Sequence, residues 1–160
     1  GFLNSDDWLN NNTLKDVDNF IKRINPNIIY GDAIFYKNNR KKFYAKAKLK
    51  KLNEDMSLLH SSIYIKKNII KKNLLNQKLI ISSDYEQLLN LHKKYKFHYI
   101  EKSLSNVSLG GKSSELNISS KEFFYIQKKK FNFFYAICNY MKKYHFHIIK
   151  ILIIFFFSKF

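Results

Sequence analysis

Two adjacent carboxylates near the start of the chain, Asp6 and Asp7, are the first residues whose types and spacing could do chemistry. Apolar residues 2–3 precede this acidic turn and apolar residues 8–9 follow it, a pattern typical of a buried strand that ends in acids at its rim. Carboxylates placed there can hold Mg²⁺ or Mn²⁺, because these cations prefer oxygen ligands and keep positions open for substrate phosphates. The alternative is a helix N-cap, in which Asp6 or Asp7 satisfies the free amides of a following turn.

A third acid, Asp84, lies at the start of residues 82–91, which the sequence predicts to open a helix. Ser83 and Glu86 have the spacing of a capping box, and the helix dipole favours acids in a first turn, so a purely structural role is one interpretation. A cap needs only Ser83 and Glu86, however. Asp84 is therefore also a candidate catalytic residue.

Three further positions combine polar or flexible residues with apolar segments. Asp32 follows the apolar residues 28–31, and its alternative role is that of a polar residue at a strand end. His60 precedes a short apolar segment, where a histidine is more often packed and hydrogen-bonded than catalytic. The pair Gly110 and Gly111 permits close approach of the backbone to a ligand, or makes a plain turn.

Taken in chain order, these segments resemble the C-terminal part of a bacterial glycosyltransferase family 2 enzyme of the GT-A fold. The matching segments are Leu3-Asn4-Ser5-Asp6-Asp7, Tyr30-Gly31-Asp32, His60 to Tyr64, Ser83-Asp84-Tyr85-Glu86 and Gly110-Gly111-Lys112-Ser113. In that family a nucleotide-binding region precedes the acid motif. We therefore expect residues 1–115 to be a piece of a longer catalytic domain that alone binds nucleotide weakly and gives no measurable transfer.

The resemblance also implies roles for the candidate residues. Asp84 matches the catalytic base of inverting enzymes, and Asp7, with Asp6 as an alternate ligand, would anchor Mg²⁺ or Mn²⁺. Substrate contacts are implied for Asp32, His60, Gly110 and Gly111. Inverting transfer needs one carboxylate to take the proton of the attacking hydroxyl, and a cation to stabilise the departing diphosphate. These tasks need separate acids, because a carboxylate bound to a metal is a poor base.

The elements around these residues alternate between helix and strand. Apolar spacing predicts a helix over residues 14–24 and a central strand over 28–36, with a turn at 38–40 and a returning strand over 43–49. A helix over 84–95 and a strand over 97–100 follow. With the resemblance, this pattern indicates an α/β fold, a partial GT-A (Rossmann-like) mixed sheet with flanking helices.

From Lys121 onward the pattern changes to an amphipathic helix. Apolar side chains recur at spacings of three and four between residues 134 and 155, and lysines lie beside them. The last apolar run, residues 148–157, is shorter than the roughly 20 residues that a membrane span requires. We interpret residues 116–160 as a helical, basic-aromatic tail. Residues 121–157 could pack on protein, or lie on an anionic membrane surface.

The composition of the chain limits the kinds of partner that we expect it to bind. The formal charge of the 160 residues is +17, but the lysines are scattered and no nucleic-acid motif is present, so we expect no nucleic-acid partner. The single cysteine, Cys138, excludes an intrachain disulfide and suits the cytoplasm. The expected partners are a nucleotide-sugar donor and a glycan or lipid-linked acceptor, in polysaccharide or lipooligosaccharide assembly. If the tail binds lipid, we expect the protein at the inner face of the cell membrane. The rival is a non-catalytic basic protein that binds nucleic acid or assembles in a larger complex.

Overall fold

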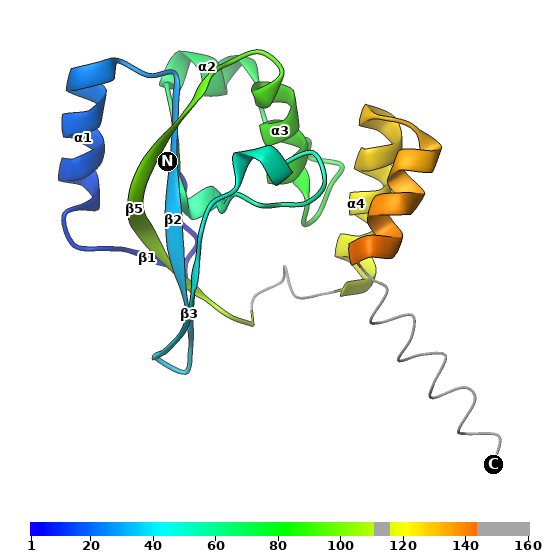
Figure 1. Ribbon diagram of the computed structural model, residues 1–160, viewed down its shortest axis with the longest axis horizontal. Helices are drawn as coiled ribbons and strands as arrows, with labels where there is room; N and C mark the ends of the chain where they lie inside the picture. The colour runs from blue at the N-terminus through cyan, green and yellow to red at the C-terminus, as the bar shows by residue number, and fades with distance from the viewer. Residues whose placement is uncertain (111–115, 144–160) are drawn as a thin grey trace. The chain divides into compact units, whose positions relative to one another are not determined.

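The computed structural model describes residues 1–110 and 116–143 of the chain. The chain divides into two compact units, Gly1–Ser114 and Glu115–Phe160. The first unit contains all the strands of the described residues and carries the candidate acids (Figure 1). The second unit is helical throughout most of its described part.

A five-stranded mixed sheet forms the centre of the first unit, with the order β1-β5-β2-β3. The two long strands β2 (Ile28–Lys37) and β5 (Phe97–Ser108) run parallel to each other. The short β1 (Trp8–Leu9) pairs antiparallel with β5. On the other side of β2, β4 (Ile63–Ile65) pairs with its first residues and β3 (Arg40–Ala45) with its last, both antiparallel.

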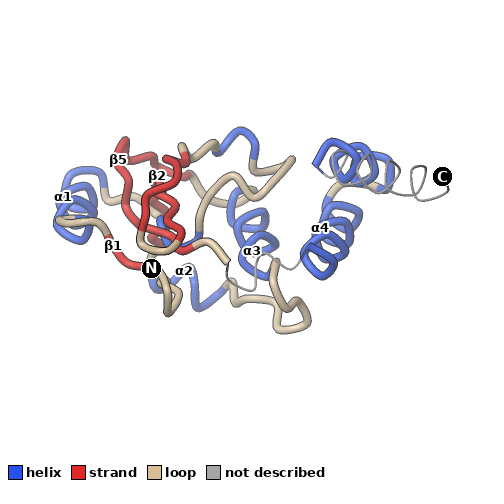
Figure 2. The backbone as a smooth tube through the Cα atoms, turned by 90° about the horizontal axis from the view of Figure 1, so that it is seen from below, coloured by secondary structure: helices blue, strands red, loops and turns tan. Residues whose placement is uncertain are grey.

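Helices lie on both sides of this sheet. α1 (Thr13–Ile24) lies on one side, and α3 (Ser83–His92) lies on the other, near the short α2 (Lys67–Lys72) (Figure 2). Two 3-10 turns, η1 (Leu49–Lys51) and η2 (His60–Ser62), interrupt the long connection from β3 to β4. The predicted α/β class, a mixed sheet with flanking helices, is therefore confirmed.

Packing between α1 and the sheet forms a core cluster. Val17 of α1 contacts Ile29 of β2 and Ile100 and Leu104 of β5, and all four side chains are buried. α1 ends where Asn25 adopts the left-handed conformation, with φ of 49°, and Pro26 follows. The predicted helix over residues 14–24 is thus confirmed, although only Val17 and Phe20 of its apolar residues pack in this cluster, and Leu14, Ile21 and Ile24 are exposed.

The hairpin from β2 to β3 is shorter than the sequence indicates. Asn38 and Asn39 form its turn with φ of 50° and 58°, the left-handed pair that tight hairpins favour. β3 begins at Arg40, directly after this turn, and ends at Ala45 instead of continuing to Leu49. Two residues beyond the end of β3, the backbone amide of Ala47 donates a hydrogen bond to the side chain of Asp32 at 2.8 Å and so is not paired with a strand.

β5 is longer and less regular than the predicted strand over residues 97–100. It continues for 12 residues, and its register against β2 shifts on both sides of Asp32. Gly31 accounts for this close approach, since a Cβ at that position would lie 2.6 Å from the Leu104 side chain and 2.8 Å from the Lys102 carbonyl oxygen. A glycine is therefore required in the Tyr-Gly-Asp segment by packing alone.

The second unit contains α4 (Leu116–Lys130) and a further helical stretch over residues 133–143. The predicted amphipathic helix over residues 134–155 is helical as far as it is described, and the remainder lies outside the described residues. Phe134 and Met141 of its expected apolar seam are exposed by 79% and 56%, and its predicted packing on protein or on a membrane stays a prediction. Ala136 and Asn139 are buried instead, since a small side chain and an amide meet α4 there.

Candidate functional site

Asp7 is the buried member of the acidic pair and lies directly before β1. Its side chain is buried, with Oδ1 accepting the Ser108 amide and Oδ2 accepting the Asn4 side-chain amide, each at 3.1 Å. Burial raises the pKa of the Asp7 carboxyl and the charge of Asp6 raises it further, while hydrogen bonds from Ser108, Asn4 and Ser61 oppose this. Asp6 itself is exposed. Of the two acids, Asp7 is therefore the one whose side chain is fixed by burial and hydrogen bonds.

The N-cap interpretation of these acids is wrong. The next helix, α1, begins at Thr13, and the residue in its N-cap position is Asn12. The acidic pair lies before β1, so the predicted buried strand that ends in these acids is wrong as well, because residues 2–3 are exposed and outside any strand. Thr13, the first residue of α1, donates its hydroxyl to the Leu104 carbonyl at 2.8 Å, which fixes the helix start on β5.

The acidic pair could give a divalent cation only part of its ligands, and the predicted metal site stays a prediction. Among residues 1–110 and 116–143, no group of three or more His, Cys, Asp and Glu side chains converges as a metal site. Asp7 and Asp6 would therefore supply at most two protein ligands. The two Asp7 oxygens have about four lone-pair sites and accept hydrogen bonds from Ser108, Asn4 and Ser61, so some capacity remains for a cation. Mg²⁺ is commonly held in this way, by one or two carboxylates together with substrate phosphates.

Asp84 lies in the first turn of α3, half-buried. The capping box predicted for Ser83 and Glu86 is out of register, because Ser82 holds the N-cap position and makes no side-chain capping hydrogen bond. The carboxylate of Glu86 is buried and accepts a hydrogen bond from the Asn76 side chain at 2.7 Å. Asp84 Oδ1 accepts the Tyr85 backbone amide at 2.7 Å. The catalytic role predicted for Asp84 stays a prediction.

His60 begins η2 and lies close to Asp84. Its ring stacks on Phe2 with centroids 4.9 Å apart and planes 14° from parallel, and its Nε2 atom is buried without a hydrogen-bond partner. Burial lowers the pKa of His60, the negative charge of Asp84 raises it, and the N-terminal amino group lowers it. At neutral pH the ring is therefore uncharged, with one nitrogen aimed at no protein group.

The turn η2 connects the two acids. Ser61 hydrogen-bonds Asp7, while its neighbour His60 faces the charge of Asp84. The hydroxyls of Ser61 and Ser62 both hydrogen-bond the Ser105 hydroxyl, at 3.0 Å and 2.6 Å. These bonds fix η2 on β5. Asp7 thus bonds to this turn, and the charge of Asp84 acts on His60 in the same turn.

Asp32 is bound by protein groups on all sides. Its side chain is 2% exposed and accepts hydrogen bonds from the Tyr99 hydroxyl at 2.8 Å, from the Ala47 amide at 2.8 Å and from the Tyr44 hydroxyl. Burial, and then the bond to Asp32 and its charge, raises the pKa of Tyr44 to about 12 and also raises that of Tyr99. Asp32 thus ties β2 to β3 and β5, and its predicted contact with substrate stays a prediction.

The glycine pair lies at the edge of the described residues. Gly110 follows β5 with φ of 114°, and open space surrounds the position of a Cβ there. This conformation explains a glycine at position 110, since other residues rarely adopt it. Gly111 lies outside the described residues.

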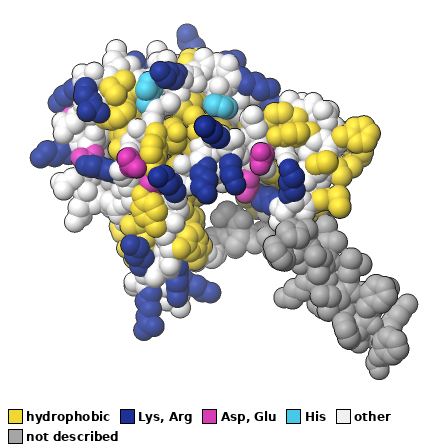
Figure 3. Space-filling model, in the orientation of Figure 1, with side chains coloured by type: hydrophobic (Ala, Val, Ile, Leu, Met, Phe, Trp, Pro, Cys, Tyr) yellow, Lys and Arg dark blue, Asp and Glu magenta, His cyan; other side chains and the backbone are white. Residues whose placement is uncertain are grey.

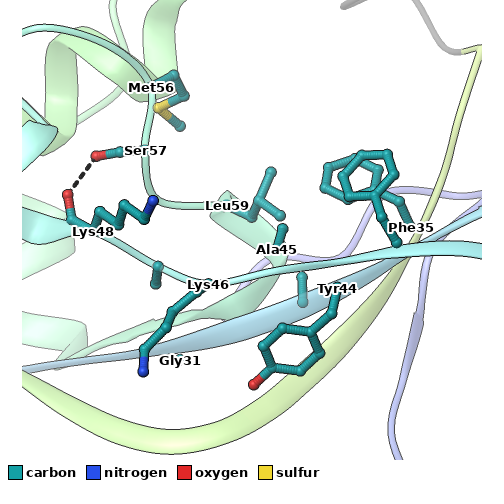
Figure 4. Close-up of a pocket in the computed structure, with 12 residues that line it drawn as sticks. Gly31, Phe35, Tyr44, Ala45, Lys46, Lys48, Met56, Ser57 and Leu59 are labelled. Atoms are coloured by element: carbon teal, nitrogen blue, oxygen red, sulfur yellow. Dashed lines mark hydrogen bonds between the residues drawn. The ribbon is translucent and has the colours of Figure 1, made fainter.

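A cavity of about 440 Å³ lies between the β2–β3 hairpin and residues 56–59 (Figure 4). Small residues line its sheet side, and larger side chains surround them: Gly31, Ala33, Ala45 and Ala47, then Phe35, Phe43, Tyr44, Lys46, Lys48, Met56, Ser57 and Leu59. The facing pair Phe35 and Phe43 stack at 4.6 Å. None of the candidate acids lines this cavity, but Leu59 at its edge is the neighbour of His60.

The cavity is the feature that the sequence analysis missed. Two pairs of small residues at a spacing of two, Gly31 with Ala33 and Ala45 with Ala47, are its only sequence signal. Such spacing leaves one face of adjoining strands without side chains to fill it. Its wall is held in place by Ser57, which donates to the Lys48 carbonyl at 2.7 Å and accepts from the Lys48 amide at 3.2 Å through its own carbonyl.

Comparisons with known proteins bear on the fold. No protein-family model matches the chain, and no curated protein gives a significant match. The structure is similar to that of residues 1–349 of the S. aureus glycosyltransferase TarS in complex with UDP-GlcNAc. The TM-score is 0.59 and the sequence identity is 17%, and the match covers 78% of this chain and 39% of the TarS chain. TarS with UDP gives a TM-score of 0.55 at 16% identity over 78% and 38%. The chain thus spans about two fifths of the TarS chain, and it has a glycosyltransferase-like fold.

Proposed function

We propose that the chain is part of an inverting, family 2-like glycosyltransferase that transfers a sugar from a nucleotide-sugar donor to a glycan or lipid-linked acceptor. The observation that carries the proposal is that Asp7 bonds to η2 and the charge of Asp84 acts on His60 in the same turn, within a glycosyltransferase-like fold. The TarS structures contain UDP-GlcNAc or UDP, which supports a nucleotide-linked donor. Such a donor and the free thiol of Cys138 suit a reaction in the cytoplasm.

In this reaction Asp84 takes the proton from the acceptor hydroxyl as that oxygen bonds to the anomeric carbon. The bond from this carbon to the donor phosphate breaks in the same displacement, and the nucleoside diphosphate leaves. Asp7, with Asp6, holds Mg²⁺ or Mn²⁺, which when bound neutralises charge on the departing diphosphate.

His60 and the cavity lie on the acceptor side in this proposal. The uncharged ring can accept or donate a hydrogen bond to a sugar hydroxyl through its unpartnered Nε2 atom. The cavity next to Leu59 offers the exposed aromatic rings of Phe43 and Tyr44, which can cover the apolar face of a sugar. The ammonium groups of Lys46 and Lys48 can bind its polar groups. Gly110 and Gly111 would let the loop after β5 approach the donor.

The first test is a titration of the chain with UDP in the presence and absence of Mn²⁺, followed by Trp8 fluorescence. Trp8 is 40% exposed and adjoins Asp7 in the chain, so its emission should change when the site fills. We expect binding that needs the metal and is lost in Asp7→Ala. Asp18→Ala is the matched control, because Asp18 is an exposed acid on α1 whose partner is Lys22.

Metal-independent binding, or binding that survives Asp7→Ala, would argue against the donor site. Tight binding of single-stranded RNA by the wild-type chain and by Asp7→Ala alike, without UDP binding, would favour the basic-protein alternative. Weak metal-dependent binding that disappears only in Asp7→Ala supports the sugar-transfer proposal.

A further inference from the structure

In the described part of the second unit, two side-chain amides are buried beside Phe123, Ile126 and Ala136, while several large apolar side chains are exposed. Gln127 of α4 and Asn139 of the 133–143 helix are buried, and the Asn139 side-chain amide donates to the Gln127 side-chain oxygen at 3.2 Å. Large apolar side chains face solvent instead: Tyr125, Phe133, Phe134 and Met141 are 52%, 48%, 79% and 56% exposed. Hydrophobic side chains accordingly gather on the surface of this unit (Figure 3). Such an exposed group in a folded helical pair marks an interaction surface.

Positive charge surrounds these apolar side chains. Residues 116–143 contain a single acid, Glu122, and six lysines: Lys121, Lys128, Lys129, Lys130, Lys142 and Lys143. The Lys128 ammonium lies 5.7 Å from the Phe133 ring centroid, and that of Lys129 lies 5.8 Å from the Tyr125 ring centroid. The cations therefore lie directly beside the exposed rings.

We propose that the aromatic-basic face made of Phe133, Phe134 and Met141, with Lys128 beside Phe133, binds the surface of an anionic lipid bilayer. A bilayer presents phosphate headgroups, which can bind the ammonium groups. A few ångströms deeper it presents an apolar interior, which the rings can enter. The charge of the face is complementary to anionic headgroups. An exposed ring such as Phe134 gains most by entering the apolar region below them. The proposal rests on the second unit alone and does not need the sugar-transfer reaction.

The test is co-sedimentation of the full chain with vesicles of phosphatidylcholine, with or without phosphatidylglycerol. We expect binding only to the anionic vesicles, and weaker binding at high salt because the charges are screened. Replacing both rings in Phe133→Ser/Phe134→Ser should lower the apparent affinity by about tenfold or more. Leu14→Ser is the matched control, since Leu14 is 63% exposed on α1 in the first unit, and should bind like the wild type.

A second variant covers the case in which the serine variant loses its helices, which far-ultraviolet circular dichroism would detect. Lys128→Gln keeps the rings and should reduce the preference for anionic vesicles. Equal binding to neutral and anionic vesicles, or no change in either variant, would overturn the proposal. So would binding of a DNA duplex that anionic vesicles fail to compete away.

Discussion

The pKa of His60 depends on the geometry of the candidate site. His60 lies in a buried position that disfavours its protonated form, while Asp84 favours that form. The net effect is a pKa below the ordinary value of 6.5. The unfolded chain therefore takes up a proton at this residue at higher pH than the folded chain does. Stability linked to His60 is present above pH 6.5 and is lost as the pH falls.

This opposition of causes predicts the response to Asp84→Asn. Removing the negative charge should lower the pKa of His60 further, which histidine ring signals in an NMR pH titration would follow. Asp18→Asn, an exposed acid on α1, should leave the pKa of His60 unchanged. If Asp84→Asn also leaves it unchanged, Asp84 does not face His60 and the link between the two acids through η2 is wrong.

Individual residues differ in how far the sequence alone could place them. The apolar, acidic, apolar pattern of the first nine residues indicates that the acids adjoin a strand, but it places that strand before the acids and the structure places it after them. The bonding of Asp32 does not follow from a local pattern, because its partners Tyr44, Ala47 and Tyr99 are 12, 15 and 67 residues away. Only the folded sheet shows that this carboxylate has structural partners.

At the scale of elements, Asp32 holds the β3 end of the sheet and one wall of the cavity. Its hydrogen bonds reach β3 through Tyr44, β5 through Tyr99 and the chain beyond β3 through Ala47. We predict that Asp32→Asn lowers the free energy of unfolding by about 1–3 kcal/mol, since hydrogen bonds to a charged, buried acceptor are lost. Amide hydrogen exchange should rise in residues 46–59, next to the cavity.

Tyr99→Phe and Leu14→Ser provide the comparison for this substitution. Tyr99→Phe removes one of the three bonds and should cost less than Asp32→Asn, with exchange at Ala47 little changed. Leu14 is exposed on α1 and should have no effect on residues 46–59. Protection that stays unchanged in Asp32→Asn would show that Lys48 and Ser57 hold this wall without Asp32.

Elements with local signals were predictable, and those shaped by long-range packing were not. Asn38 and Asn39 between apolar strands indicated the hairpin, because left-handed residues suit a tight turn. The irregular course of β5 depends on contact between Gly31 and Leu104, which lie far apart in the sequence. The outward direction of Phe134 depends on the buried bond between Asn139 and Gln127, which periodicity alone does not show.

At the scale of the whole molecule, the two units contain separate sets of buried residues. The first has its core between α1, β2 and β5, and the second buries Phe123, Ile126 and Ala136. The candidate acids and the cavity belong to the first unit, and the aromatic-basic face belongs to the second. This division separates the chemistry proposed for the chain from its proposed attachment to a membrane.

We therefore predict that a chain ending at Ser114 keeps cooperative thermal unfolding and metal-dependent UDP binding but loses binding to anionic vesicles. Its core cluster of Val17, Ile29, Ile100 and Leu104 is complete without the second unit. Calorimetry, the Trp8 titration and vesicle sedimentation measure the three properties on one preparation. Loss of cooperative unfolding would mean that the first unit needs the second for its stability. Retained vesicle binding would place the lipid contact on the lysines of the first unit, against the aromatic-basic face.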